Sequence, residues 1–263
     1  MIRIGIGGWV FEPWRGVFYP EGLPQKRELE HASRHVTSIE INGTYYGTQK
    51  PESFRKWAEE TPDDFVFALK GSRYTTNRRK LAEAGESIRR LIDSGITELG
   101  DKLGPINWQF METKAFDPED FEAFLALLPE KEGSRRLRHA VEVRNDSFKV
   151  PEFVALARKY GVAIVLADSD SFPLIADPTA DFVYARLQAA SEAEQVGYSA
   201  AALDAWHQRA KTFAKGGVPH DLPLLAEAGE HDGGRDVFIY MINGFKPKAP
   251  AAAMALIERL GGR

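Results

Sequence analysis

The stretch from residue 139 to residue 168, HAVEVRNDSFKVPEFVALARKYGVAIVLAD, predicts a complete strand, helix and second strand. Residues 139–143 and 163–167 are short apolar runs of the kind that forms buried strands. Between them, Pro151 suits the first turn of a helix and Gly161 suits the residue after its end. A helix over 151–160 that joins two buried strands indicates a parallel pair with a helical crossover.

The same alternation continues in both directions along the chain. Further strands are expected at 2–7, 37–41, 65–69, 103–110, 182–187 and 236–242. Helices are expected at 29–36, from 51 to the stop at Thr61 and Pro62, at 86–99 with an interruption near Gly95, at 118–128, 200–214 and 250–260. No helical period is found between Asp168 and Phe182, so the crossover between the sixth and seventh strands is expected to be shortened. Eight strands favour closure into one α/β domain over residues 1–263, a single (β/α)₈ TIM-like barrel.

The composition of the chain is consistent with a barrel and excludes several kinds of active site. A chain of 263 residues has the usual size of one such barrel. It contains no cysteine, which excludes disulfides, thiolate nucleophiles and sulfur-ligated metal centres. No window is long and apolar enough for a membrane helix, and the chain opens on a strand instead of a signal segment, so we expect no membrane association and a cytoplasmic location. The net charge of −4 gives no overall attraction to nucleic acid.

An open, doubly wound sheet is the rival architecture. Gly5, Gly7 and Gly8 follow a first strand and resemble a dinucleotide-binding loop. In the pattern G-x-G-x-x-G, however, the third glycine would fall at Val10. The fingerprint is absent, which favours the barrel.

Polar and charged residues stand where the predicted strands end. In a parallel barrel all these ends meet in one ring, so residues far apart in sequence converge on one pocket. Three are acids, Glu40, Glu142 and Asp168, the candidate catalytic residues. Two facing carboxylates could divide into acid and base, because desolvation and a like charge raise one pKa while a cation such as Arg144 keeps the other ionised. In the alternative interpretation, Glu142 and Arg144 simply neutralise each other.

The cationic, tyrosine and amide side chains near the predicted strand ends indicate which kind of ligand the pocket would bind. Lys70 and Arg73 begin a basic run that continues through residues 78–80, and Arg186 adds a cation from the seventh strand. Cations beside acids indicate an anionic ligand, and tyrosine rings offer surfaces on which a sugar or base can stack. Amide side chains could orient hydroxyl groups. The full set of candidate substrate-binding residues is Asn42, Tyr45, Tyr46, Lys70, Arg73, Tyr74, Gln109, Arg144, Arg186 and Asn243.

No cofactor and no metal ligand is predicted. Barrel enzymes that hold zinc or isomerase metals bring histidines to the strand ends. The six histidines here are expected in helices, at a strand start or in the loop before the last strand: His31, His35, His139, His207, His220 and His231. Mg²⁺ or Mn²⁺ could still be held by oxygen ligands alone, through the three acids with Asn42.

Six motifs occur in order along the chain: Gly8-Trp9, Phe18-Tyr19-Pro20, residues 40–46 (EINGTYY), residues 67–74 (FALKGSRY), Leu103-Gly104-Pro105 with Gln109, and Glu142-Val143-Arg144. Together they resemble the DUF72 family, also called YecE-like. The resemblance covers nearly the whole chain and implies a TIM-like barrel whose biochemical activity is unassigned. Two positions depart from the family pattern: Asn77 stands where a histidine is common after the Tyr-Thr-Thr stretch, and Asn145 with Asp146 stands where His-Pro is common. A catalytic role of either family histidine would be lost here.

Three functions follow as hypotheses. The first is an enzyme that acts on a phosphorylated or polyhydroxylated, sugar-like small molecule by general acid–base chemistry, which leaves hydrolase, lyase and isomerase open. The second is a nucleic-acid-binding protein or nuclease that uses the basic loop after the third strand. The third is a noncatalytic ligand sensor. The sequence does not specify substrate, reaction type or oligomeric state, because this fold hosts many unrelated chemistries.

Overall fold

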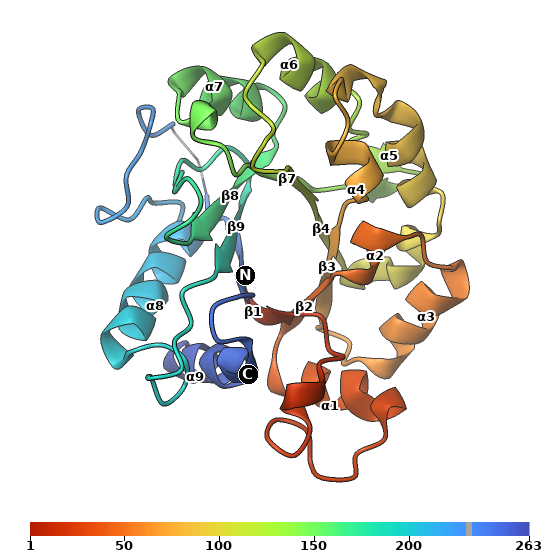
Figure 1. Ribbon diagram of the computed structural model, residues 1–263, viewed down its shortest axis with the longest axis vertical. Helices are drawn as coiled ribbons and strands as arrows, with labels where there is room; N and C mark the ends of the chain where they lie inside the picture. The colour runs from red at the N-terminus through yellow and green to blue at the C-terminus, as the bar shows by residue number, and fades with distance from the viewer. Residues whose placement is uncertain (230–232, 263) are drawn as a thin grey trace.

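The computed structural model describes residues 1–229 and 233–262. Eight parallel strands form a closed barrel in the order β1-β10-β9-β8-β7-β4-β3-β2, with helices around it (Figure 1). The predicted (β/α)₈ barrel is therefore confirmed. The barrel strands are β1 (Ile2–Gly7), β2 (Ser38–Ile41), β3 (Val66–Lys70), β4 (Leu103–Gln109), β7 (His139–Glu142), β8 (Ala163–Asp168), β9 (Phe182–Leu187) and β10 (Asp236–Met241).

The helices match the predicted periods, with several short additions. The longer ones are α1 (Glu28–His35), α3 (Pro51–Glu60), α5 (Gly85–Ile92), α6 (Pro118–Ala126), α7 (Pro151–Lys159), α8 (Ala200–Ala214) and α9 (Ala249–Arg259). The sequence did not predict the one-turn helices α2 (Gly43–Tyr46) and α4 (Arg73–Thr76), nor a hairpin of β5 (Lys131–Glu132) and β6 (Arg135–Arg136). Short 3₁₀ segments are Glu12–Trp14, Gln25–Arg27, Leu81–Glu83, Ile96–Lys102, Asp146–Phe148 and Lys246–Lys248.

Two crossovers depart from the regular pattern as expected. The helix predicted over 86–99 stops at Ile92, and a 3₁₀ segment begins at Ile96. Gly95 between them has φ +95°, a left-handed conformation that glycine adopts without steric cost. Residues 169–181, all of which the structure describes, contain no helix, so the shortened crossover between β8 and β9 is confirmed.

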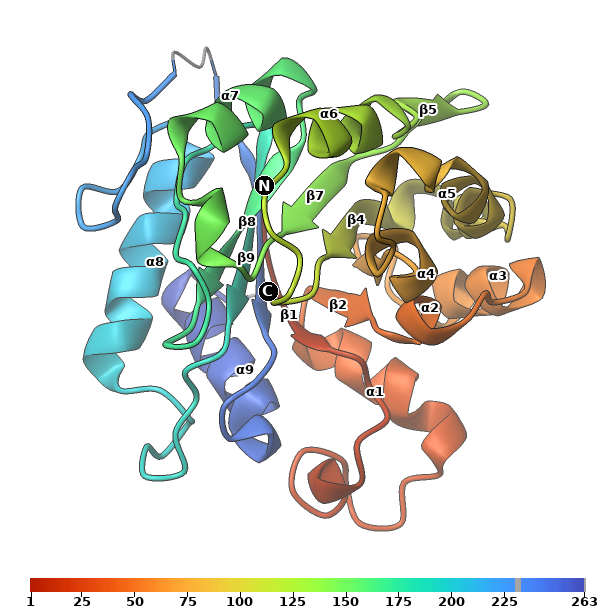
Figure 2. The ribbon, with the colours of Figure 1, turned by 45° about the horizontal axis from the view of Figure 1, so that its top comes forward.

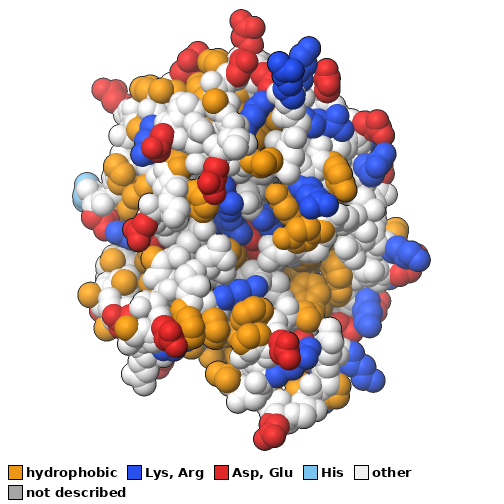
Figure 3. All heavy atoms as spheres, in the orientation of Figure 1, with side chains coloured by type: hydrophobic (Ala, Val, Ile, Leu, Met, Phe, Trp, Pro, Cys, Tyr) orange, Lys and Arg blue, Asp and Glu red, His pale blue; other side chains and the backbone are white. Residues whose placement is uncertain are grey.

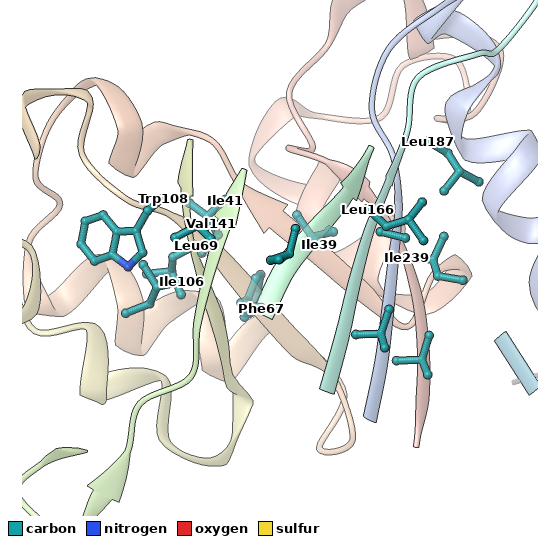
Figure 4. Close-up of a cluster of buried hydrophobic side chains, with 14 of the residues drawn as sticks. Ile39, Ile41, Phe67, Leu69, Ile106, Trp108, Val141, Leu166, Leu187 and Ile239 are labelled. Carbon is teal, nitrogen blue, oxygen red and sulfur yellow. The ribbon is translucent and has the colours of Figure 1, made fainter. Parts of the chain in front are cut away.

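The strands alternate between two environments. Outward-facing side chains such as Ile39, Leu69 and Trp108 pack in the layer between barrel and helices (Figure 4). Inward-facing side chains form a second cluster inside the barrel, which includes Tyr184 and Tyr240. This period of two decides, for each strand, which residues can reach the interior.

Close packing against both neighbouring strands requires Gly5 in β1. A Cβ atom there would lie 2.2 Å from the carbonyl oxygen of Ser38 and 3.0 Å from the ring of Tyr240. The missing side chain therefore leaves room for the backbone of β2 and for the Tyr240 ring of β10.

The two ends of the barrel differ in what surrounds them. The loop after β1 and the short helices α2 and α4 lie around the end where the strands terminate, and the β5–β6 hairpin lies towards the other end (Figure 2). Figure 1 looks into the first of these ends, which we call the mouth. None of the helices in the described part of the chain has the length and apolar character needed to cross a membrane.

Candidate functional site

Six inward-facing polar side chains gather inside the barrel just below the mouth. Two of them follow an inward-facing alanine on their strand, since Lys70 follows Ala68 and Glu142 follows Ala140. None is more than 8% exposed, although interiors of such barrels are usually filled with branched apolar residues. The six are Glu40 on β2, Lys70 on β3, Asn107 and Gln109 on β4, Glu142 on β7 and Arg186 on β9.

Arg186 joins the two glutamates. Its Nη1 donates to Glu142 Oε2 at 2.6 Å, and its Nη2 donates to Glu40 Oε1 at 3.0 Å. Glu40 and Glu142 are fully buried and Arg186 is 2% exposed. Two carboxylates that are far apart in the sequence are thus bridged by one guanidinium. The planar group of arginine can do this because its two Nη atoms donate to different acceptors.

The remaining oxygens of the glutamates also have donors. Arg144 donates twice to Glu142 Oε1, from Nε at 3.1 Å and from Nη2 at 2.9 Å. Asn107 Nδ2 donates to Glu142 Oε2 at 3.1 Å and to Glu40 Oε2 at 3.4 Å, and the Tyr184 hydroxyl donates to Glu40 Oε2 at 2.5 Å. All four carboxylate oxygens are therefore hydrogen-bonded, as buried charges require.

This environment keeps Glu142 ionised. Burial by itself would raise the pKa of Glu142, but Arg186, Arg144 and Lys70 outweigh it and lower that pKa to about 2. The opposite charges also raise the pKa of Arg186 against the effect of its own burial. The geometry matches the alternative interpretation from the sequence, in which Glu142 and Arg144 neutralise each other, and disfavours Glu142 as a proton donor near neutral pH.

Lys70 is the group in this cluster whose pKa comes close to neutrality. Its Nζ donates to Gln109 Oε1 and lies 4.3 Å from the centre of the Tyr45 ring. Burial lowers the pKa of Lys70, and so does Arg186, while Glu40 and Glu142 offset only part of the effect, leaving the pKa at about 8. Lysines desolvated beside another cation are the ones that proteins use as bases and nucleophiles.

Three buried polar atoms in and beside the cluster have no hydrogen-bond partner among the described residues. They are Asn107 Oδ1, Arg186 Nε and Gln188 Nε2. Gln188 follows β9 two residues after Arg186, so it shares the inward parity of that strand. Buried donors and acceptors without partners are costly, and their presence beside a polar cluster indicates capacity for a ligand or ordered water.

The mouth above the cluster carries cations and tyrosines. Arg73 lies over the rings of Tyr46 and Tyr74, at 5.7 and 5.4 Å from their centres, and these two rings are 64% and 60% exposed. Asn42 precedes α2 at the end of β2, next to Gly7. Figure 3 shows lysine and arginine side chains around a central hollow of this face, with an acidic side chain deep within it.

Asp168 and Asn243 do not share the inward direction of the cluster residues. Asp168 ends β8 with the parity of the outward-facing residues Ile164 and Leu166, and its Oδ2 accepts a hydrogen bond from Trp206 Nε1 of α8 at 3.1 Å. The expectation that Asp168 lies beside the two glutamates is therefore wrong, because its side chain points to α8. Asn243 is exposed and follows the inward-facing Ile242, so it does not share the inward parity.

The oxygen-ligand set considered for Mg²⁺ or Mn²⁺ is not assembled. Asp168 faces α8, and the oxygens of Glu40 and Glu142 already accept hydrogen bonds from the arginines. Within residues 1–229 and 233–262, no group of three or more histidines or acids is arranged to hold a metal ion. His139 lies at the start of β7, as expected, buried against Trp108, and His231 lies outside the described residues.

Asn107, Tyr184 and Gln188 are members of the site that the sequence reasoning missed. Asn107 and Tyr184 each stand two residues before a predicted site residue, Gln109 and Arg186, and Gln188 stands two residues after Arg186. Extending the period-two pattern along each strand would have found all three.

Cavities at the other end of the barrel do not include this cluster. One of about 520 Å³ lies beside β1, α8 and α9, and another of about 890 Å³ lies near the starts of β7 and β9. In this fold that end contributes stability and the mouth carries the chemistry. The cluster at the mouth is therefore the candidate site.

A model of the family described as "Protein of unknown function DUF72" matches residues 3–263. The chain belongs to the DUF72 family. It is 28% identical to UPF0759 protein YecE of Escherichia coli over 148 residues, and 26% identical to UPF0759 protein YunF of Bacillus subtilis over 158 residues. These matches cover 56% and 58% of the chain and 50% and 54% of the relatives, so the chain spans about half of their length.

Solved structures show the same fold. A DUF72 family protein from Thermotoga maritima superposes with a TM-score of 0.75 at 24% identity, covering 99% of both chains. A DUF72 family protein from Enterococcus faecalis gives 0.70 at 17% identity, covering 100% of this chain and 98% of that one. At these identities the likeness supports the fold alone.

Of the two departures from the family pattern, only Asn145 has side-chain hydrogen bonds within the described residues. Asn145 donates from Nδ2 to the carbonyl oxygen of Glu112 at 2.7 Å, and its Oδ1 accepts from the backbone and hydroxyl of Ser147. Asn77 is exposed and ends α4. Neither contacts the buried cluster through an interaction in the described structure.

Proposed function

We propose that this DUF72 protein is an enzyme that acts on a small phosphorylated or polyhydroxylated molecule at the mouth, with Lys70 as the group that exchanges protons. The observation that carries the proposal is the buried cluster of two acids, two cations and two amides at the strand ends, with Arg144 bonded to it from the mouth. Buried ion pairs rarely stabilise more than apolar packing would, so a fold has little reason to keep such a cluster for stability alone.

The roles of the charged groups differ from those that the sequence suggested. Glu142 is held as an anion, so it serves to position Arg186 and Arg144 instead of acting as an acid, and Glu40 bonds the same Arg186 from the other side. Lys70, with its pKa at about 8, can give or take a proton near neutral pH. Arg144, 17% exposed at its side chain, stands nearest to the mouth and can bind an anionic group of the ligand.

Thermal unfolding in the presence of candidate ligands tests the proposal. The panel contains sugar phosphates, sugar acids and nucleotides, each with and without Mg²⁺ or Mn²⁺, and the proteins are the parent, Lys70→Ala and Lys246→Arg. A ligand at a hundred times its dissociation constant stabilises by about 2.7 kcal/mol, or roughly 5–10 °C for a chain of this size. We expect one ligand class to shift the parent and Lys246→Arg, with turnover of that ligand lost in Lys70→Ala.

The control lysine lies on the same face but outside the cluster. Lys246 Nζ lies 4.5 Å from the Phe11 ring, and burial lowers its pKa too. A ligand that shifts all three proteins equally would place binding elsewhere and contradict the proposal. Binding without turnover by the parent would favour the sensor hypothesis.

A second function is favoured by the segment after β3. Among the described residues, Arg73, Arg78, Arg79 and Lys80 form no salt bridge, and two exposed tyrosines flank Arg73. Unpaired cations beside exposed rings suit a single-stranded nucleic acid. Affinity for a short oligonucleotide would then fall with salt at a slope of about 0.7 per phosphate contact. Replacing Arg78 and Arg79 together by alanine would reduce that slope; an unchanged slope would contradict this function.

A further inference from the structure

Lys70 differs from Lys102 and Lys248, two other lysines that are partly buried. Lys102 Nζ donates to three oxygens, the carbonyls of Ala58 and Thr61 and the Thr61 hydroxyl, between 2.5 and 3.3 Å. Lys248 Nζ donates to two backbone carbonyls, at 2.6 and 2.7 Å. Lys70 has one amide oxygen and one ring face. Its ammonium group is the least solvated by protein oxygens of the three.

Lys70 forms no salt bridge with the two glutamates of the cluster. Glu40 and Glu142 face the same interior, yet their oxygens are bonded to Arg186, Arg144, Asn107 and Tyr184. Among the described residues no carboxylate lies within salt-bridge distance of Lys70 Nζ, whereas Arg186 lies close enough to lower its pKa. This arrangement favours the neutral amine, whose nitrogen carries a free electron pair.

The position of the amine suits attack on a bound molecule. Lys70 ends β3, where the interior opens to the mouth, and the flat ring of Tyr45 covers one side of Nζ. At pH 8 about half of a group with a pKa of about 8 is unprotonated. Lysines that meet these conditions form Schiff bases with carbonyl substrates.

We propose that Lys70 forms an imine with an aldehyde or ketone carbonyl of the substrate, which makes that substrate a small oxo compound with hydroxyl or anionic groups. This inference rests on the proposed function and narrows its substrate class. Nζ donates its electron pair to the carbonyl carbon while the C=O π pair moves to oxygen, and one proton passes from nitrogen to that oxygen. The C–O bond then breaks with one more proton taken from solvent, so that water leaves and a protonated C=N bond remains.

Reductive trapping tests the imine directly. The intact protein is incubated with dihydroxyacetone phosphate or pyruvate and sodium cyanoborohydride, and the labelled lysines are mapped by peptide mass spectrometry. We expect Lys70 to be labelled at least tenfold faster than Lys246, with a rate that rises with pH to a midpoint near 8. Labelling spread evenly over the lysines, or no label at Lys70 with either probe, would overturn the proposal.

Two variants keep the result interpretable if the parent label is weak. Lys70→Arg preserves the cation but cannot form an imine, so the dominant label must disappear while the fold, checked by circular dichroism, remains. Lys246→Arg must keep that label. If the ligand panel shows binding and turnover but Lys70 is not trapped, the imine fails and the proposed function stands. If neither binding nor trapping occurs, both fail.

Discussion

At the scale of single residues, Arg186 determines how the interior is charged. It is 2% exposed and bonds one oxygen of each glutamate, so removing either acid deprives this buried cation of one of its two carboxylate partners. Breaking one side of such a pair costs about 3–5 kcal/mol, because the remaining charge cannot return to water.

Glu142→Gln should therefore destabilise the protein by about 3–5 kcal/mol at pH 7. The pKa of Glu142 is lowered to about 2 in the folded state and lies near 4.5 in the unfolded chain. Its contribution is thus present above pH 4.5 and lost as the pH falls towards 2. We expect urea unfolding to show a large difference between parent and variant at pH 7 that shrinks below pH 4. The exposed change Glu152→Gln serves as the control, and an equally small effect of both would refute the prediction.

Lys70→Met should change the free energy of unfolding in the opposite direction and stabilise the protein. The pKa of Lys70 is lowered from 10.5 to about 8, so charging this lysine costs stability below pH 8. We expect the variant to be more stable than the parent by about 1–3 kcal/mol at pH 7, after allowing for the lost bond to Gln109. The parent gains stability as the pH rises from 8 towards 10.5, so the difference should narrow there. Lys56→Met on the surface should stay within about 0.5 kcal/mol; a destabilised Lys70→Met would contradict the assigned environment.

At the scale of elements, the direction of each strand end decides its role. Asp168 ends β8 but bonds Trp206 of α8, and its pKa is raised by burial. Asp168 therefore links α8 to the barrel through a hydrogen bond and does not point into the mouth.

Asp168→Asn should accordingly leave ligand binding and turnover unchanged. The amide oxygen can still accept the indole hydrogen bond, so we expect a loss of no more than about 1 kcal/mol in unfolding free energy. Isothermal titration with the ligand found for the parent checks the affinity, with Glu142→Gln measured alongside. A tenfold loss of affinity in Asp168→Asn would restore this acid to the site.

At the scale of the whole molecule, closure depends on the first and last strands. β1 pairs in parallel with β10, from Ile2 opposite Val237 to Ile6 opposite Met241. The two strands lie near opposite ends of the sequence. The barrel has no free edge only because these distant segments meet.

Deleting residues 1–7 should abolish folding, because it exposes the edges of β2 and β10 and the interior beside Gly5. We expect loss of the cooperative thermal transition in circular dichroism and aggregation of the product. Removing Met1 alone, which forms an exposed ion pair with Asp236, should cost about 1 kcal/mol or less. A truncated protein that still melts cooperatively would show that closure is not essential.

The sequence by itself determined the strands, the order of the elements and the barrel, because apolar runs and helix signals are local. It also placed the polar residues at the strand ends, including Glu40, Lys70, Glu142 and Arg186. Only the tertiary structure decided which of them meet. β8 is buried on both faces and reads as continuous apolar sequence from 163 to 167, so its parity, and with it the direction of Asp168, could not be seen. The pKa values of Glu142 and Lys70 likewise arise from neighbours on other strands, since a charge responds to what surrounds it in space and not to its place in the chain.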